Sequence, residues 1–285
     1  MNYSDWQPTC DTLHAHTQVL GKLAAKLAAP EPQLQHSALR LTARGIETLP
    51  LPAPDGAGVF VVALDLHRHE AVVERSDGRE QRIPLTPNRA VADVTRDVIA
   101  AVQVEISMKP QEVPWTAPLD EDTEHATYDT DHVAAYFADA TRAALVLAAL
   151  RAPYRGRSTP VNFWWGSFDL AVNLFSGAPA APPSQDFIFR NAMDVQEIAV
   201  GWWPGDGRYA KPAFYAYAHP APPALAQATL AHGSWNADLG EFVLDSDAGS
   251  DALEFARSVT AHACAVCGWN PALAASIEGS PPPVA

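Results

Sequence analysis

P-V-N-F-W-W-G-S-F-D-L-A-V-N-L-F-S-G, residues 160–177, is the stretch around which the fold is organised, because it combines a run of aromatic rings with one carboxylate, Asp169. Residues 161–163 and 168–175 suit a pleated, half-buried surface, and Gly166 and Ser167 between them fit a tight turn or a bulge. The two-residue period of a strand then places Asp169 on a mostly apolar face. Asp169 is therefore either a satisfied structural acceptor or a functional acid with a perturbed pKa.

Composition limits the classes of function that this chain can serve. The 285 residues are 48% hydrophobic and carry a formal charge of -14, with no run of basic residues. This balance argues against binding to nucleic acid or to anionic membranes, which begins with a cationic patch. No apolar stretch approaches the ~20 residues of a membrane span, and residues 1–7 do not resemble a signal peptide. We therefore expect a cytoplasmic protein.

Hydrophobic periodicity divides the chain into two halves, each with the order helix, antiparallel strands, helix. The first half has predicted helices at 11–28 and 87–102 and predicted strands at 39–43, 59–65, 71–75, 81–85 and 104–107. The second has predicted helices at 132–150 and 250–267 and predicted strands at 161–163, 168–175, 195–203, 213–218, 229–235 and 241–244. We expect one α+β domain over residues 1–270, with halves of about 8–108 and 131–270 joined by a Pro-rich acidic loop, and a mobile tail at 271–285. Antiparallel sheets from both halves would enclose an aromatic-lined pocket, with helices outside.

Two groups of histidines and cysteines raise the question of a metal. Asp65, His67 and His69 fall at two-residue spacing, which on a strand would place all three on one face and offer zinc or iron a partial ligand set. Polar residues are also ordinary at a strand end before a turn. Cys264 and Cys267 lie near the end of a predicted helix without a second pair of ligands, which favours small buried thiols. We expect no metal and no cofactor.

Several polar residues have the chemistry of a binding site. His14, Gln18 and Lys22 recur every four residues, so they form one ridge of the first helix, either solvated or facing a cleft. In the long loop before the helix at 132–150, the residues whose side chains have such chemistry are His125, Tyr128 and Asp129. In the segment before residue 160, Arg157 could hold an anionic group or Asp169, and simple surface placement fits equally well.

Seven segments of the chain, taken together, resemble an uncharacterised family, domain of unknown function 5996. The segments are L-H-A-H-T-Q-V-L-G-K, T-A-R-G, D-L-H-R-H, H-A-T-Y-D, G-R-S-T-P-V-N-F-W-W-G-S-F-D-L, G-W-W-P-G and F-Y-A-Y. The resemblance implies one continuous unit covering nearly the whole chain, and it implies no known activity. Family members tend to have a His-Trp-Trp-His element where this chain has residues 33–36, Tyr-Ser-His-Glu where it has 194–197, and His where it has Asn162. If those histidines bind metal or move protons in relatives, this protein does different chemistry or only binds.

The function that we expect first is general acid–base catalysis on a small organic molecule. No G-x-G-x-x-G, Walker loop, H-E-x-x-H or G-x-S-x-G occurs, which removes the usual dehydrogenase, NTPase, zincin and serine-hydrolase hypotheses. The expected catalytic residues are Asp169, Glu197 and His14, and Trp165, Trp202 and Tyr215 are the expected pocket walls. Alternatives are a non-catalytic ligand-binding or scaffold protein and, third, a zinc or iron enzyme.

Overall fold

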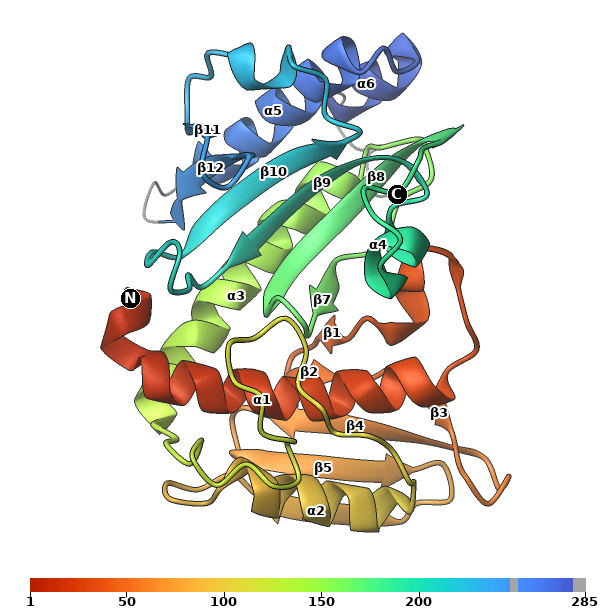
Figure 1. Ribbon diagram of the computed structural model, residues 1–285, viewed down its shortest axis with the longest axis vertical. Coiled ribbons are helices and arrows are strands. Elements are labelled where there is room, and N and C mark those ends of the chain that lie inside the picture. Colours follow the sequence, from red (N-terminus) through yellow and green to blue (C-terminus); the bar gives the residue numbers. More distant parts are fainter. Residues whose placement is uncertain (247–250, 279–285) are drawn as a thin grey trace, which may run out of the picture. The chain divides into compact units, whose positions relative to one another are not determined.

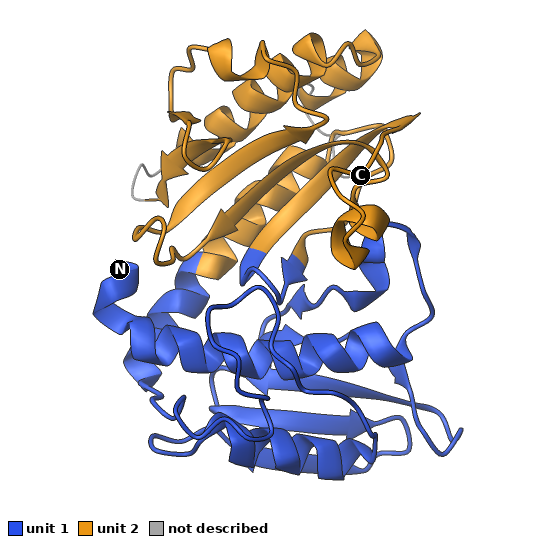
Figure 2. Ribbon diagram, viewed as in Figure 1, with its two compact units in different colours: residues 1–139, 163–169 blue, residues 140–162, 170–285 orange. Residues whose placement is uncertain are grey.

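A computed structural model describes residues 1–246 and 251–278 and confirms the α+β class. The chain forms two compact units, which Figure 2 shows in separate colours. Unit 1 comprises residues 1–139 and 163–169, and unit 2 comprises residues 140–162 and 170–285. The predicted order of helix, strands and helix in each half is confirmed, and each half contributes one antiparallel sheet (Figure 1).

The first sheet, in unit 1, has the strand order β1-β2-β4-β5-β6, with β3 paired to β4. Its strands are β1 (Arg40–Leu41), β2 (Gly45–Glu47), β3 (Leu51–Pro52), β4 (Val59–Asp65), β5 (Glu70–Arg75) and β6 (Glu80–Pro84). The predicted strand at 59–65 is confirmed residue for residue. Gly78 supplies the left-handed position, with φ of 87°, in the turn between β5 and β6.

Two helices pack against this sheet: α1 (Tyr3–Leu27) contacts β3 and β4, and α2 (Val91–Val102) contacts β5 and β6. The predicted start of α1 at Asp11 was late. The Asp5 carboxylate accepts the backbone N–H of Asn2 at 3.1 Å, so the first turn is capped well before Pro8, which the helix contains. A short 3-10 helix, η1 (Pro32–Ser37), follows α1.

The segment 163–169 folds with unit 1 because it packs against α1. The backbone of Phe163 exchanges two hydrogen bonds with Leu39, at 2.9 and 3.0 Å. The Trp165 ring occupies a notch at Gly21, where a Cβ would lie 2.0 Å from the ring, and its Nε1 donates to the carbonyl of Ser37 at 3.0 Å. The aromatic stretch thus anchors its turn on the first helix, and the chain then enters the second sheet.

The second sheet has the strand order β11-β12-β10-β9-β8-β7. Its strands are β7 (Asn162–Trp164), β8 (Asp169–Pro179), β9 (Val195–Trp203), β10 (Ala213–His219), β11 (Ser234–Asn236) and β12 (Glu241–Asp245). Gly201 pairs with Ala171 on one side and with Tyr215 on the other. Directly paired residues share a face, so the odd-numbered residues of β8, β9 and β10 form one face, the odd face, and the even-numbered residues form the even face.

The even face of these strands is the core of unit 2. It carries Leu170, Val172, Leu174, Val200, Trp202 and Ala216, all buried. Helix α5 (Ala252–Val266) contacts β9, β10 and β12, and its His262 ring meets Phe242 of this face edge-on. In Figure 1 α5 lies above β10, with α6 (Pro271–Glu278) beside it. The tail predicted from residue 271 was wrong as far as Glu278, because residues 271–278 form a helix packed on α5, and the rest of that prediction lies outside the described residues.

Helix α3 (Thr130–Arg151) runs through the division between the units. It is the one described helix long and apolar enough to cross a membrane by length and composition, with a mean hydropathy of 1.5, which corrects the expectation that no stretch approaches that length. Its stripe of Val133, Ala140, Leu147 and Leu150 is buried, as in a core helix. The strand predicted at 104–107 is absent from the described chain, and residues 103–129 have no helix or strand. The remaining elements are α4 (Phe187–Ala192) and η2 (Leu225–Gln227).

Candidate functional site

The polar ridge of α1 lies under loops of unit 1. Gln18 is fully buried, and its side chain both donates to the carbonyl of Gln111 at 2.8 Å and accepts the N–H of Gln111 at 2.9 Å. Lys22 places its ammonium 5.4 Å from the centre of the Trp165 ring, and burial, followed by nearby Lys109, lowers its pKa. The ridge is therefore not a solvated face. Gln18 holds the loop at residue 111 against the helix, so its role is structural positioning.

His14 holds the aromatic turn in place. Its Nε2 lies 2.9 Å from the carbonyl oxygen of Trp165 and 3.0 Å from that of Gly166, so this nitrogen carries the proton and donates to both. The ring stacks on Phe168, with 4.8 Å between centroids. Burial lowers the pKa of His14 to about 4, so the ring is neutral near pH 7. This arrangement favours a role in holding the turn over the proton transfer expected from the sequence.

A buried carboxylate orients His125 in the same unit. The side chain of Asp122 is 1% exposed, and its Oδ2 lies 2.6 Å from Nδ1 of His125. Its Oδ1 accepts the backbone N–H groups of Glu124 at 3.0 Å and His125 at 3.1 Å. An ionised carboxylate only accepts, so Nδ1 of His125 carries a proton and Nε2 is left as the basic nitrogen of the neutral ring.

The start of α2 fixes the backbone of this Asp–His pair. The first N–H groups of a helix lack partners within it. Here the N–H of Val91 donates to the carbonyl of His125 at 2.8 Å, and that of Ala92 donates to the carbonyl of Asp122 at 2.9 Å. The loop thereby caps the helix, and the helix in turn fixes the backbone positions of Asp122 and His125.

Trp115 lies against two imidazoles. Its ring is 4.7 Å from that of His125 and 5.6 Å from that of His14, measured between centroids. Its Nε1 is buried and has no hydrogen-bond acceptor within residues 1–246 and 251–278. His16, two residues after His14, is 2% exposed, and burial, followed by the charge of Arg89, lowers its pKa to about 4. A tryptophan with a buried, unpaired N–H donor thus lies against the ring of His125.

Asp169 begins β8 beside this aromatic cluster. It is 5% exposed and accepts the hydroxyl of Ser167 at 2.5 Å. Burial, with the charges of Cys10 and Asp169 adding to it, raises the pKa of Tyr136, whose ring stacks on Phe168. Asp169 is therefore placed as the sequence predicted, on a mostly apolar surface, and it has a local partner.

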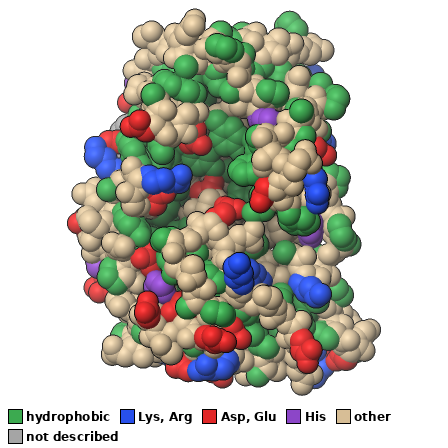
Figure 3. Space-filling model, in the orientation of Figure 1, with side chains coloured by type: hydrophobic (Ala, Val, Ile, Leu, Met, Phe, Trp, Pro, Cys, Tyr) green, Lys and Arg blue, Asp and Glu red, His purple; other side chains and the backbone are tan. Residues whose placement is uncertain are grey.

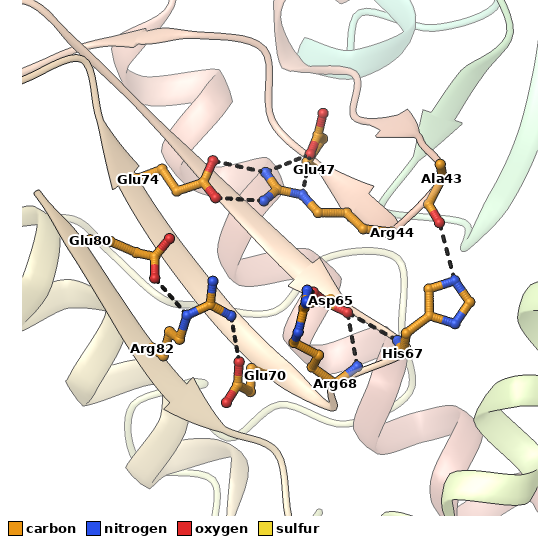
Figure 4. A network of polar contacts seen from close by, with 10 residues as sticks. All are labelled: Ala43, Arg44, Glu47, Asp65, His67, Arg68, Glu70, Glu74, Glu80 and Arg82. Atoms are coloured by element: carbon orange, nitrogen blue, oxygen red, sulfur yellow. Dashed lines mark hydrogen bonds and ion pairs between the residues drawn. The ribbon is translucent and has the colours of Figure 1, made fainter. Parts of the chain in front are cut away.

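Asp65, His67 and His69 do not share one strand face as expected, because β4 ends at Asp65 and the two histidines lie in the turn that follows. Asp65 accepts the N–H groups of His67 and Arg68 and pairs with the Arg68 guanidinium at 3.2 Å, and Nε2 of His67 bonds the carbonyl of Ala43 (Figure 4). Within the described residues no three His, Cys, Asp or Glu side chains gather as metal ligands.

Tyr128 is buried at the same end of the sheet. Its hydroxyl bonds Nδ1 of His69 at 3.2 Å, the two rings meet edge-on, and burial raises its pKa. His69 adopts a positive φ of 56° in the turn, which directs its ring toward Tyr128. Tyr128 therefore fixes this turn, and its hydroxyl is engaged within the fold.

Glu197 lies on the odd face of unit 2 and is 2% exposed. Burial raises its pKa to about 7, while a 3.3 Å hydrogen bond from Nδ2 of Asn173 and the charge of Arg157 act in the opposite direction. The Arg157 guanidinium lies over the ring of Phe175, 3.8 Å from its centre. The sequence singled out Glu197 and Arg157 separately, and the structure brings them together.

Two of the three residues predicted to line the pocket, Trp202 and Tyr215, lie on different faces of the second sheet. Trp202 belongs to the even face, is 1% exposed and donates through Nε1 to the hydroxyl of Ser246 at 3.1 Å, so it is a core residue of unit 2 and not a wall beside Glu197. Tyr215 belongs to the odd face, where its ring crosses Gly201.

The predicted acids Asp169 and Glu197 belong to different units. In the strand register Glu197 pairs with Phe175, whereas Trp202 pairs with Leu170, the neighbour of Asp169. Five residues of extended strand span about 17 Å. The register therefore gives no support to one acid–base pair formed by these two carboxylates.

Asp122 and Trp115, which both lie beside His125, were not singled out from the sequence. Asp122 precedes His125 by three residues within an acidic run, and the useful signal was this D-x-x-H spacing in a loop. Trp115 is an isolated tryptophan in a Pro-rich segment, and nothing in its immediate neighbours indicates that it would contact two histidines.

Comparison with known proteins gives a family. No curated protein and no solved structure shows significant similarity to this chain. A model of a family of unknown function, DUF5996, matches residues 1–276, which is nearly the whole chain, in agreement with the resemblance of its motifs. The protein is therefore a member of the DUF5996 family.

Proposed function

We propose that the protein is an enzyme that transfers a proton on a small organic molecule, with His125 as the base and Asp122 as the residue that orients it. The observation that carries this proposal is the 2.6 Å contact between Nδ1 of His125 and the buried Asp122 carboxylate. A carboxylate in this position fixes the tautomer of the imidazole and stabilises the imidazolium that forms when the ring takes a proton.

The accessible nitrogen of His125 supports this role. Its side chain is 17% exposed, and Nε2 has no hydrogen-bond partner in the part of the chain that the structure describes. A base must reach the proton it removes at hydrogen-bond distance, which requires a nitrogen that the fold itself does not occupy. His125 satisfies this condition, whereas Nε2 of His14 is engaged by two carbonyl groups.

The indole of Trp115 limits the kind of substrate. Its buried N–H has no acceptor among the described residues, and leaving such a donor unpaired costs about 1–3 kcal/mol. A ligand oxygen would satisfy it. With ring centroids only 4.7 Å apart, one small molecule can reach Trp115 and His125 together. We therefore infer a substrate that presents an oxygen acceptor next to an acidic C–H or O–H group.

Proton transfer can be detected without knowing the substrate. Wild-type protein is incubated with a metabolite extract in D₂O, and mass spectrometry records which compounds are retained, converted or labelled with deuterium. We expect wild type to label or convert at least one compound, and His125→Gln to lose this activity. Asp129→Asn is the matched control, because Asp129 also precedes a histidine, His132, by three residues, but at 3.9 Å and with 51% of its side chain exposed.

The outcomes separate catalysis from binding alone. A compound retained by wild type without conversion would favour the alternative of a non-catalytic ligand-binding protein. Conversion that His125→Gln leaves intact in a folded variant would overturn the assignment of the base.

A further inference from the structure

The odd face of unit 2 has aromatic rings on β10 beside small residues on β9. The Tyr215 ring crosses Gly201, where a Cβ would lie 2.3 Å from it, and Tyr217 pairs with Ala199. The two tyrosine rings are parallel within 5°, with 6.3 Å between centroids, and both are half-buried. Figure 3 shows this face hollowed, with hydrophobic side chains on its floor. Aromatic rings beside small residues leave room for a flat apolar part of a ligand, such as a ring.

The rings of Tyr217, Tyr215 and Trp203 form a row, and Trp203 lies at the end opposite Tyr217. Its ring meets that of Tyr215 at 5.5 Å and that of Tyr209 at 5.6 Å between centroids. A row of electron-rich ring faces attracts a cation as well as an apolar group. The row therefore accepts both parts of a ligand that joins a positive charge to a ring.

The polar groups on this face are acceptors. Nδ2 of Asn173 donates to Oε2 of Glu197, which leaves Oδ1 of Asn173 and Oε1 of Glu197 to accept from other donors. Oδ1 of Asn173 is buried and has no partner among the described residues. Ala199 pairs with both Asn173 and Tyr217, so this unpaired acceptor lies one strand away from the tyrosine row. Two adjacent acceptors are matched by a group that only donates.

Charge favours the same kind of group. An ammonium supplies up to three donors, has no acceptor and carries the sign opposite to the formal charge of -14 of the chain. Other charged or titratable groups also lie near Glu197: Arg157 and Asp194 act on it electrostatically, and His219 pairs with it across the strands. The Arg157 guanidinium is stacked on the Phe175 ring, as described above.

We propose that the odd face of unit 2 binds a small organic molecule in which a protonated amine is joined to a flat aromatic or apolar body. The ammonium contacts Asn173 and Glu197, and the body lies against the rings of Tyr215 and Tyr217. Every residue of this site belongs to unit 2, so the proposal is independent of the base assigned to unit 1.

Three probes that differ only in their polar group test the proposal: phenethylamine, 2-phenylethanol and 3-phenylpropionate. Isothermal titration calorimetry on the full chain at neutral pH measures each affinity. We expect saturable binding of the amine and affinities at least about tenfold weaker for the alcohol and the acid. Glu197→Gln should weaken the amine about tenfold, and Asp238→Asn, which removes an exposed charge in the same unit, should leave it unchanged.

A second variant protects the test against misfolding of Glu197→Gln. Tyr217→Ala changes a half-buried ring and should weaken the amine and the alcohol in parallel, because both present the same phenyl group to it. Equal affinity for the three probes, no saturable binding of the amine, or amine affinity unchanged in a folded Glu197→Gln protein would each overturn the proposal.

Discussion

Asp122 and Glu197 are almost equally buried, at 1% and 2% exposed, but their surroundings differ. Asp122 accepts from two backbone N–H groups and from the imidazole of His125. Glu197 accepts one side-chain hydrogen bond, from Asn173, and burial raises its pKa to about 7. Burial alone therefore does not decide what a carboxyl group can do. The donors aimed at it decide which role it is suited to.

From this difference we infer distinct chemistry for the two units. A carboxylate held by three donors is suited to orienting another group, which is the role that we propose for Asp122 toward His125. A carboxyl group with few donors changes charge within the neutral range and is suited to meeting a ligand cation. The predictions below test this contrast, beginning with the largest expected effect.

Replacing Asp122 by Asn should abolish most of the proton-transfer activity. The amide would present a donor or a weaker acceptor to Nδ1 of His125, so the ring would lose the tautomer that leaves Nε2 basic. We expect a loss of about ten-thousandfold in turnover of whichever compound the wild type converts, by analogy with the same substitution in a catalytic triad. Nitrogen-15 chemical shifts of the histidine rings would report the tautomer directly. A folded Asp122→Asn protein with full activity would contradict the orienting role.

The state of Glu197 should make the stability of unit 2 depend on pH. A folded-state pKa near 7 lies above the unfolded value of 4.5, so the native state holds its proton more tightly. This contribution is fully present below about pH 4.5 and is lost as the pH rises to about 7. We expect the free energy of unfolding of wild type, relative to Glu197→Gln, to fall by about 3 kcal/mol across this window. Denaturant unfolding of both proteins at several pH values measures the difference, and parallel curves would show that Glu197 ionises normally.

The sequence predicted the elements of the fold better than the site. The strands at 59–65 and 195–203 were predicted with their true ends, because long runs of β-branched and aromatic residues have a clear period. The alternation of β8 correctly placed Asp169 and Asn173 on a face opposite Leu170. By contrast, residues 104–107 form no strand although their composition suits one, since pairing depends on a neighbour that the local sequence does not specify.

The candidate site could not be predicted in the same way, because it depends on contacts between distant parts of the chain. The sequence suggested His14 and Asp169 as catalytic because of their residue types, but the direction of their side chains is set by partners such as the carbonyl of Trp165. From the sequence, the stretch around His125 was a loop with side chains suited to a binding site. Only the fold shows that the start of α2 holds that loop in place. The D-x-x-H spacing occurs at Asp122 and again at Asp129, and only the fold shows that the first of these pairs is buried and in close contact.

The smallest expected effect concerns stability at two Asp residues with the same spacing to a histidine. Asp122→Asn replaces a buried acceptor that is fully used, so one of its donors is left poorly matched, at a cost of about 1–3 kcal/mol. Asp129→Asn changes an exposed residue whose Oδ1 accepts the N–H groups of Asp131 and His132 at the start of α3. Asn caps a helix nearly as well as Asp, so the expected loss is clearly smaller. Thermal unfolding of both variants measures the two losses under one set of conditions, and equal losses would show that the donors around Asp122 contribute no more than an exposed cap does.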